Sequence, residues 1–138
     1  MSASHSRSQK HILKVGLAVI DGARVLVVRK RGGFRFILPG GKPESGENDV
    51  QTLRREIEEE LGCGLDDKTI EFLGDFTDTA ADMTDTTVTV RLYKGRLDGR
   101  PSPRSEIETL RWVASGEDDG SLAPSLRNQI LPFLFSQA

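Results

Sequence analysis

The chain has too few cysteines for a disulfide-stabilised or thiolate-metal protein, because Cys63 is its single cysteine. One cysteine excludes an internal disulfide and fits a reducing compartment. Long apolar runs are also missing, since the segment from Ile12 to Ile20 is interrupted by Lys14 and Gly16 and is too short to span a bilayer. The N-terminal MSASHSRSQKH lacks the apolar stretch of a signal peptide. We therefore expect a cytoplasmic protein with no membrane partner.

An excess of one charge sign is absent as well. The 19 basic and 21 acidic residues give a net charge of −2, which provides no general attraction to nucleic acid or to anionic membranes. We predict no nucleic-acid partner, so phosphate recognition must come from local basic residues or from a metal. A length of 138 residues suits one domain. We predict a flexible, Ser-rich arm over residues 1–11 and a single domain over residues 12–138, as a monomer or a homodimer.

The most informative segment runs from Gly41 to Cys63 and reads GKPESGENDVQTLRREIEEELGC. Residues on a helix advance by about 100°, so Glu56, Glu59 and Glu60 fall at about 0°, −60° and 40°. The pattern predicts a helix from Asn48 to Leu61 with an apolar stripe beside three clustered carboxylates. Such a cluster is repulsive without a cation, and Mg²⁺ and Mn²⁺ prefer oxygen ligands of this kind.

This segment resembles the Nudix box, G-x5-E-x7-R-E-U-x-E-E-x-G-U, in which U is a bulky aliphatic residue. The one departure is Cys63 in the last aliphatic position, where a free cysteine packs as a small hydrophobe. The positions that match at the correct spacing are Gly41, Glu47, Arg55, Glu56, Ile57, Glu59, Glu60 and Gly62. The resemblance implies an α/β fold, the Nudix α/β/α sandwich with a mixed β-sheet. It also implies metal-dependent hydrolysis of the diphosphate linkage in a nucleoside diphosphate linked to another group.

The resemblance further implies roles for individual residues. The expected metal ligands for Mg²⁺ or Mn²⁺ are Glu56, Glu59, Glu60 and the backbone carbonyl of Gly41 or Gly40, and the expected catalytic residues are Glu56, Glu59, Arg55 and Glu106. We interpret Arg55 as a residue that orients a carboxylate, with a plain surface ion pair as the alternative. Glu106 would approach the metal or act as a base, and a solvated loop acid remains the alternative.

Substrate recognition is less well defined by the sequence. Arg29, Arg35 and Lys42 lie near the loop before the box and are candidates for phosphate contacts, although a basic loop is also an ordinary surface. The aromatic residues Phe34, Phe36, Phe76 and Tyr93 are expected in the core rather than stacked on a base. MutT-like enzymes carry an Asn near the start of the last helix to read a purine, whereas this chain has Ser125 there and a displaced Asn128. That difference argues against oxidised guanine nucleotides and leaves the small nucleotide substrate open.

The remaining pattern predicts the other elements and two alternatives to a hydrolase. Apolar alternation and turn residues predict strands over residues 12–20, 24–30, 35–38, 69–77, 86–97 and 108–113, and a helix over residues 124–135. A non-catalytic nucleotide-sensing Nudix domain is the main alternative, and the complete carboxylate set argues against it. An isomerase of the isopentenyl diphosphate type would need acid and nucleophile residues for which the sequence offers no candidate.

Overall fold

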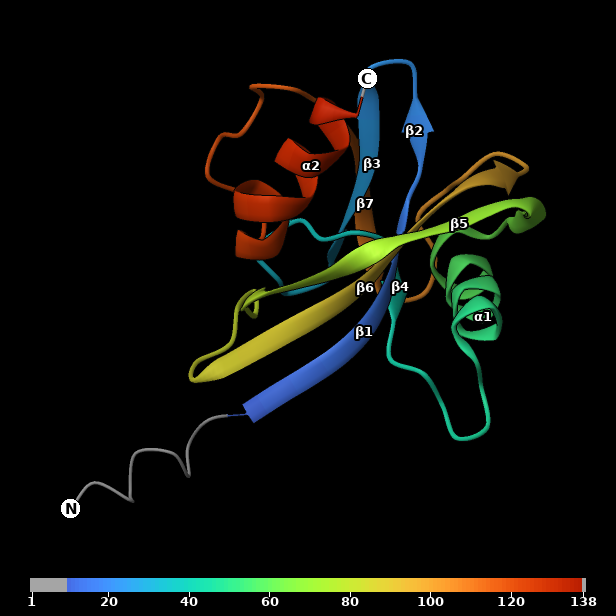
Figure 1. The fold of residues 1–138 in the computed structure, drawn as a ribbon, viewed down its shortest axis with the longest axis horizontal. Coiled ribbons are helices and arrows are strands. Elements are labelled where there is room, and N and C mark those ends of the chain that lie inside the picture. The colour runs from blue at the N-terminus through green and yellow to red at the C-terminus, as the bar shows by residue number, and fades with distance from the viewer. Residues whose placement is uncertain (1–9, 138) are drawn as a thin grey trace.

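The structure, a computed structural model, describes residues 10–137 and arranges their strands in two sheets (Figure 1). The first sheet has the order β4-β1-β6-β5 and contains β1 (Lys10–Ala18), β4 (Gly40–Gly41), β5 (Gly64–Thr79) and β6 (Thr86–Asp98). The second has the order β2-β3-β7 and contains β2 (Ile20–Asp21), β3 (Arg24–Lys30) and β7 (Ile107–Ala114). Strands β1 and β6 are parallel and all other pairs are antiparallel, so the first sheet is mixed.

Helices cover both sides of the strands, and each side has its own apolar core. Figure 1 shows α1 (Asp49–Leu61) on one side and the C-terminal helical segment, η2 (Leu126–Ile130) followed by α2 (Leu131–Ser136), on the other. Strand β1 serves both cores because its side chains alternate. Leu17 packs in the core with Ile57 of α1, and Ala18 packs in the core with Leu126. The arrangement confirms the predicted α/β/α sandwich with a mixed sheet.

Helix α1 begins and ends at residues that fix its position. At its N-terminus, the Asn48 side chain accepts the Gln51 N–H at 2.8 Å and the Gln51 side chain accepts the Asn48 N–H at 2.9 Å, a reciprocal capping box. At its C-terminus, Gly62 has a φ of 69° and donates its N–H to the Glu58 carbonyl at 3.0 Å. Both ends agree with the predicted helix. The two caps fix the ends of the helix and therefore the face on which its carboxylates lie.

Strand β5 is longer than the sequence pattern predicted, and β1 lies two residues earlier in the chain. Strand β5 spans Gly64–Thr79 instead of residues 69–77, with register shifts between Asp66 and Glu71 and between Phe72 and Gly74. These irregularities break the alternation that sequence analysis depends on. Strand β1 begins at Lys10, so Lys10 and His11 of the predicted arm pair with β6. Residues 1–9 of that arm lie outside the described residues.

Residues 35–38 do not form the predicted strand. Ile37 exchanges backbone hydrogen bonds with Val28, whereas Phe36 bonds to the backbone of residues 121 and 123. Each residue is therefore satisfied by a different neighbour, and no ladder develops. The strand in this region is instead β4, which pairs with β1 and places Gly40 and Gly41 opposite Gly16 and Val15.

The C-terminal helix lies where the sequence predicted it but contains an irregular turn. Leu131 donates its N–H to the Leu126 carbonyl, five residues earlier, which is the bonding of a π turn. Pro132 follows directly and has no N–H of its own to continue the ordinary pattern. Within residues 10–137, no helix has both the length and the apolarity that a bilayer span requires.

Two of the phenylalanines that were expected in the core have opposite environments. Phe36 is 7% exposed and lies between the guanidinium groups of Arg29 and Arg111, at 5.7 and 4.9 Å from its ring centroid. Phe34 is 81% exposed, so its predicted place in the core is wrong. The reason is local: the Phe34 N–H bonds to the Asp82 side chain at 2.9 Å, which holds this loop at the surface.

Candidate active site

Two glycines allow β4 to lie close to β1 on one side and to helix α1 on the other. Gly40 has a φ of 142°, and a β-carbon there would lie 2.0 Å from the Val15 carbonyl oxygen. A β-carbon at Gly41 would lie 2.2 Å from Oε2 of Glu56. Real side chains do not reach such distances, so any larger residue at Gly41 would displace this carboxylate. The glycine turn at the start of the box therefore makes room for a carboxylate beside the backbone.

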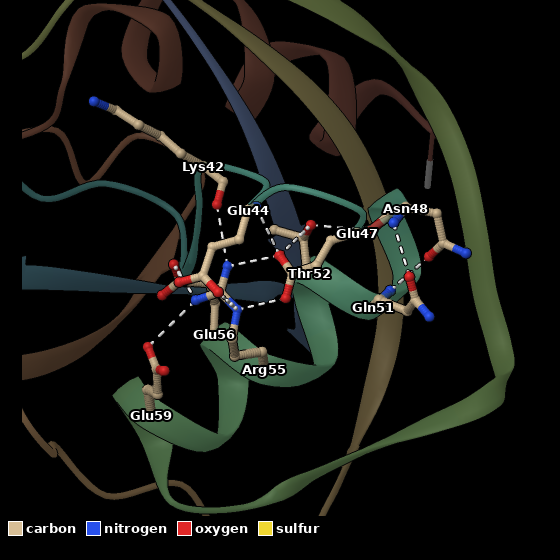
Figure 2. A network of polar contacts seen from close by, with 9 residues as sticks. All are labelled: Lys42, Glu44, Glu47, Asn48, Gln51, Thr52, Arg55, Glu56 and Glu59. Carbon is tan, nitrogen blue, oxygen red and sulfur yellow. Dashed lines mark hydrogen bonds and ion pairs between the residues drawn. The ribbon is translucent and has the colours of Figure 1, made fainter.

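Arg55 is the centre of a hydrogen-bond network on the exposed side of α1 (Figure 2). Its Nε and Nη2 donate to the two carboxylate oxygens of Glu47 at 2.6 and 2.8 Å. Its Nη1 donates to Glu56 at 3.1 Å and to Glu59 at 3.5 Å. A further bond, of 3.1 Å, joins Nη2 to the Lys42 carbonyl. Arg55 therefore lies among the carboxylates and donates hydrogen bonds to Glu47, Glu56 and Glu59.

Glu47 is held at the loop before the helix rather than directed at the carboxylate cluster. Besides Arg55, it accepts hydrogen bonds from the Glu44 N–H at 2.9 Å and from the Thr52 hydroxyl at 3.1 Å. The Arg55 hydrogen bond is the main cause that lowers the pKa of Glu47 to about 2. Glu47 thus stays charged and anchors Arg55.

Glu60 is the buried member of the cluster, and Glu56 is partly buried. Glu60 is 3% exposed, and its Oε1 accepts the Gly40 N–H at 3.1 Å. Burial is the main cause that raises the pKa of Glu60 to about 8, with the charge of Glu56 contributing less. Burial likewise raises the pKa of Glu56 against the opposing effect of Arg55. Both carboxylates resist ionisation mainly because they are removed from water, which is what a bound cation would offset.

Glu59 and Glu106 complete the same pocket from its open side. The Glu59 side chain is 53% exposed, and Glu106, from the loop before β7, forms an ion pair of 3.1 Å with Lys30. The pocket holds about 210 Å³ and is lined by Lys30, Gly40, Glu44, Arg55, Glu56, Glu59, Glu60, Ser105 and Glu106. The structure thus brings together every residue that the sequence predicted as catalytic.

The donor set of this pocket fits a hard divalent cation such as Mg²⁺ or Mn²⁺. In the side-chain conformations seen over residues 10–137, no three carboxylate, imidazole or thiol groups converge on one ion position. The reason is that Glu56 and Glu59 bond to Arg55, while Glu60 bonds to the Gly40 N–H. The pocket nevertheless offers three carboxylates: Glu56 and Glu60, whose pKa values are raised by burial, and Glu59, which is exposed to water. Carboxylate oxygens are the ligands that these ions prefer.

The three candidate phosphate-binding residues have different surroundings. Arg29 is engaged, because it pairs with Glu108 at 3.3 Å and donates to the Gly33 carbonyl at 3.2 Å. Arg35 donates to the Leu122 carbonyl at 3.3 Å and lines a cleft of about 300 Å³ between the loops of residues 31–35 and 81–83. The Lys42 side chain is exposed and extends away from Arg55 (Figure 2).

Two further lysines lie at the site: Lys30, which belongs to the basic stretch that the sequence offered for phosphate contacts, and Lys14, which sequence analysis did not select. Lys30 lines both the carboxylate pocket and the basic cleft, because β3 ends beside the loop that carries Glu106. Lys14, in the middle of β1, lines an apolar cavity that also borders Gly40. The sequence did contain a clue to Lys14. It is a charged residue in an otherwise apolar strand, and because side chains alternate along a strand it lies on the same face as Gly16 and Ala18.

The C-terminal helix contributes a serine rather than an asparagine to this cavity. Ser125 is buried and lines the cavity with Leu126 and Ile130. Asn128 is directed elsewhere, since its side-chain amide donates to Asp78 at 3.1 Å. The displaced position of Asn128 in the sequence therefore corresponds to a different contact in the structure.

Comparison with known proteins places this fold and site in one family. The family model described as the NUDIX domain matches residues 10–129. A protein of Mycobacterium tuberculosis that is provisionally named 8-oxo-dGTP diphosphatase 2 is 33% identical over 104 residues, which cover 72% of this chain and 71% of the relative.

Solved structures show the same fold. The crystal structure of a MutT NUDIX hydrolase from Burkholderia pseudomallei is similar with a TM-score of 0.72 at 21% identity, covering 94% of this chain and 99% of that one. A protein from Chromobacterium violaceum, provisionally assigned to the nudix hydrolase family, has a TM-score of 0.70 at 27% identity and covers 91% of this chain and 78% of its own.

Proposed function

This chain belongs to the Nudix hydrolase family, and from that membership we propose that it hydrolyses the diphosphate linkage of a small nucleotide with the help of Mg²⁺ or Mn²⁺. The substrate would be a nucleoside triphosphate or a related nucleoside diphosphate linked to another group. One observation carries the proposal. Glu56, Glu59 and Glu60 share a single open pocket with Arg55 and with Glu106, which comes from a distant loop.

The roles of the residues follow from their surroundings. A bound divalent cation supplies positive charge that neutralises phosphate oxygens and favours attack by water. Glu60, which is buried, and Glu56, which is partly buried, would hold it, with Glu59 completing the set. Arg55 keeps Glu56 and Glu59 in place through its own anchor on Glu47. Arg55 thus acts through the carboxylates and not on the phosphate.

A base must accept the proton of the attacking water, and Glu106 is the candidate that stands opposite the helix. Its carboxylate is exposed and pairs with Lys30 at 3.1 Å. A polyanionic substrate would compete for Lys30, which would release Glu106 toward the pocket. Glu106 would then be free to accept a proton. Lys30 lines both the carboxylate pocket and the neighbouring cleft that contains Arg35, and would supply positive charge to the substrate.

The choice of nucleotide and the cellular setting are part of the proposal. The name of the M. tuberculosis relative points to oxidised guanine nucleotides, while Ser125 in place of an asparagine argues for a different base preference. The substrate panel must therefore include both kinds. The single cysteine and the net charge of −2 support a cytoplasmic protein that acts on a small molecule, as a monomer or a homodimer.

The test is hydrolysis by purified protein with Mg²⁺ or Mn²⁺ of nucleoside triphosphates, 8-oxo-dGTP and nucleoside diphosphate sugars. The products measured are the nucleoside monophosphate together with pyrophosphate from a triphosphate, or with a sugar phosphate from a diphosphate sugar. Glu60→Gln serves as the inactive reference. We expect metal-dependent turnover of at least one nucleotide by the wild type alone. Tight nucleotide binding without turnover in either protein would favour the sensing alternative and contradict the proposal.

A further inference from the structure

Lys14 is a cation inside the molecule that the proposed mechanism does not use. It lies on β1 one residue before Val15, which pairs with Gly41 of β4. Its side chain lines the cavity with Leu38, Val90 and Ile130, and Ser125 supplies the other polar side chain in the lining. Lysine is rarely placed in such surroundings for stability, because Leu or Met would fill the same space without removing a charge from water.

No ion pair satisfies this charge among the described residues. Within residues 10–137, no carboxylate lies close enough to Lys14 to form an ion pair: Glu60 bonds to Gly40, and Glu56 bonds to Arg55. Burial is the main cause that lowers the pKa of Lys14, and the charge of Lys30 lowers it further. A partly buried ammonium without an ion pair costs stability, which indicates that it is retained for contact with something absent from the free protein.

The charges around Lys14 identify the kind of group it could contact. The charges of Lys30, Glu60, Lys42 and Glu56 all act on its ammonium. Continuing the β1–β4 register by one residue places Lys42 opposite Lys14. Two neighbouring lysines, with a third at the end of β3, repel one another unless an anion lies between them. This combination favours a polyanion over a neutral or cationic group.

The cavity beneath Lys14 limits the size of that group. It holds about 40 Å³, room for about three water molecules and too little for a nucleobase ring. Gly40 borders both this cavity and the carboxylate pocket. The ammonium therefore stands at the edge between them, where phosphate oxygens held at the carboxylate pocket would come within its reach.

We propose that Lys14 is a substrate-binding residue that contacts the diphosphate of the substrate from the β1 side, next to Lys42 and across β4 from the carboxylates of α1. The proposal rests on the proposed function for the identity of the substrate. Its anionic partner is a diphosphate group, whatever nucleoside it carries. Base selection then falls to the roomier cleft beside Arg35 and Asp82.

The test compares Lys14→Met and Lys14→Gln with Lys68→Met, a matched exposed lysine on β5. The readouts are KM and kcat with the best nucleotide, the Kd for inorganic pyrophosphate in the presence of Ca²⁺, and the melting temperature without metal. A charge-assisted hydrogen bond predicts that KM and Kd rise about 10- to 100-fold in both Lys14 variants. The metal-free Lys14→Met protein should melt about 3 °C higher than the wild type, and Lys68→Met should change nothing.

The outcomes separate this inference from the proposed function. Unchanged KM and Kd in both Lys14 variants, in an enzyme that hydrolyses nucleotides, would overturn the role of Lys14 and leave the function intact. A lower melting temperature with unchanged affinity would show that Lys14 is structural. Lys14-dependent pyrophosphate binding without nucleotide hydrolysis by the wild type would support this inference and contradict the proposed function.

Discussion

The N–H of Gly40 donates a hydrogen bond of 3.1 Å to Oε1 of Glu60, which joins β4 to the last turn of α1. This bond holds a carboxylate that is almost completely removed from water. Because the acceptor is a single oxygen, the second oxygen of Glu60 is left for a ligand. The pairing explains how the protein tolerates a buried acid at a position where burial raises its pKa to about 8.

Glu60→Gln should abolish most of the activity without unfolding the protein. A glutamine oxygen can still accept the Gly40 N–H, but it supplies no charge to a metal, so turnover should fall by at least about a thousandfold. Glu58→Gln, on the exposed side of the same helix, is the matched control and should retain wild-type turnover. Wild-type turnover in Glu60→Gln at saturating Mg²⁺ would remove Glu60 from the ligand set.

Glu60 should also make the metal-free protein less stable as the pH rises. Its pKa is raised from 4.5 to about 8 on folding, so the folded state binds its proton more tightly than the unfolded state. The stability from that proton is complete below pH 4.5 and is lost as the pH rises toward 8. With a chelator present, the melting temperature of the wild type relative to Glu60→Gln should fall over this range, and a constant difference would contradict the burial of an ionisable Glu60.

Arg55→Lys should lower turnover while leaving the overall fold unchanged. Lysine cannot reproduce the two parallel bonds from Nε and Nη2 to Glu47, so Glu56 and Glu59 lose their common orienting group. We expect turnover to fall about a hundredfold. Arg54→Lys is the control, since Arg54 pairs only with Asp67 at the surface. Equal turnover in both variants would reduce Arg55 to an ordinary surface ion pair.

Glu106→Gln should lower turnover about 10- to 1000-fold, the contribution of a positioned base. The pH–rate profile of kcat should lose its acidic limb as well, which loss of a merely structural contact would not cause. Glu108→Gln is a suitable comparison, because Glu108 lies two residues further on and pairs with Arg29. An unchanged rate and pH profile would mean that Glu106 is a solvated loop acid with no catalytic role.

Metal binding should raise the melting temperature through the same carboxylates. The shift should follow RT ln(1 + [L]/Kd), with Mn²⁺ binding more tightly than Mg²⁺. Ca²⁺ should stabilise the protein but support poor turnover, because its larger coordination shell would misplace the attacking water. Melting curves of the wild type and of Glu56→Gln/Glu60→Gln against metal concentration provide the measurement. Equal shifts in the two proteins would mean that the ion binds elsewhere.

Helix α1 could be predicted from the sequence because the residues that define it lie close together along the chain. The spacing of Glu56, Glu59 and Glu60 fixes their face, and Asn48 and Gly62 mark the ends of the helix. Arg55 could be assigned an orienting role for the same reason, since its partners lie within the box or one turn away.

The substrate side could not be predicted in the same way, because its contacts join distant segments. Arg29 was selected for phosphate binding, yet the pairing of β3 with β7 brings Glu108 to it. The ion pair of Lys30 with Glu106 also depends on that pairing and on the bulge at the end of β3. Phe34 was assigned to the core because it is aromatic. The hydrogen bond between its N–H and Asp82, a contact between distant segments, explains why it is exposed.

The alternation of side chains along β1 has a consequence for how this protein can evolve. Leu17 belongs to the core beneath the catalytic helix, and Ala18 belongs to the core beneath the C-terminal helix. Substitutions in the second core can reshape the space next to the substrate while the first core keeps the carboxylates in register. Because β1 separates the two cores, substitutions that would alter the proposed substrate preference need not disturb the carboxylates of α1.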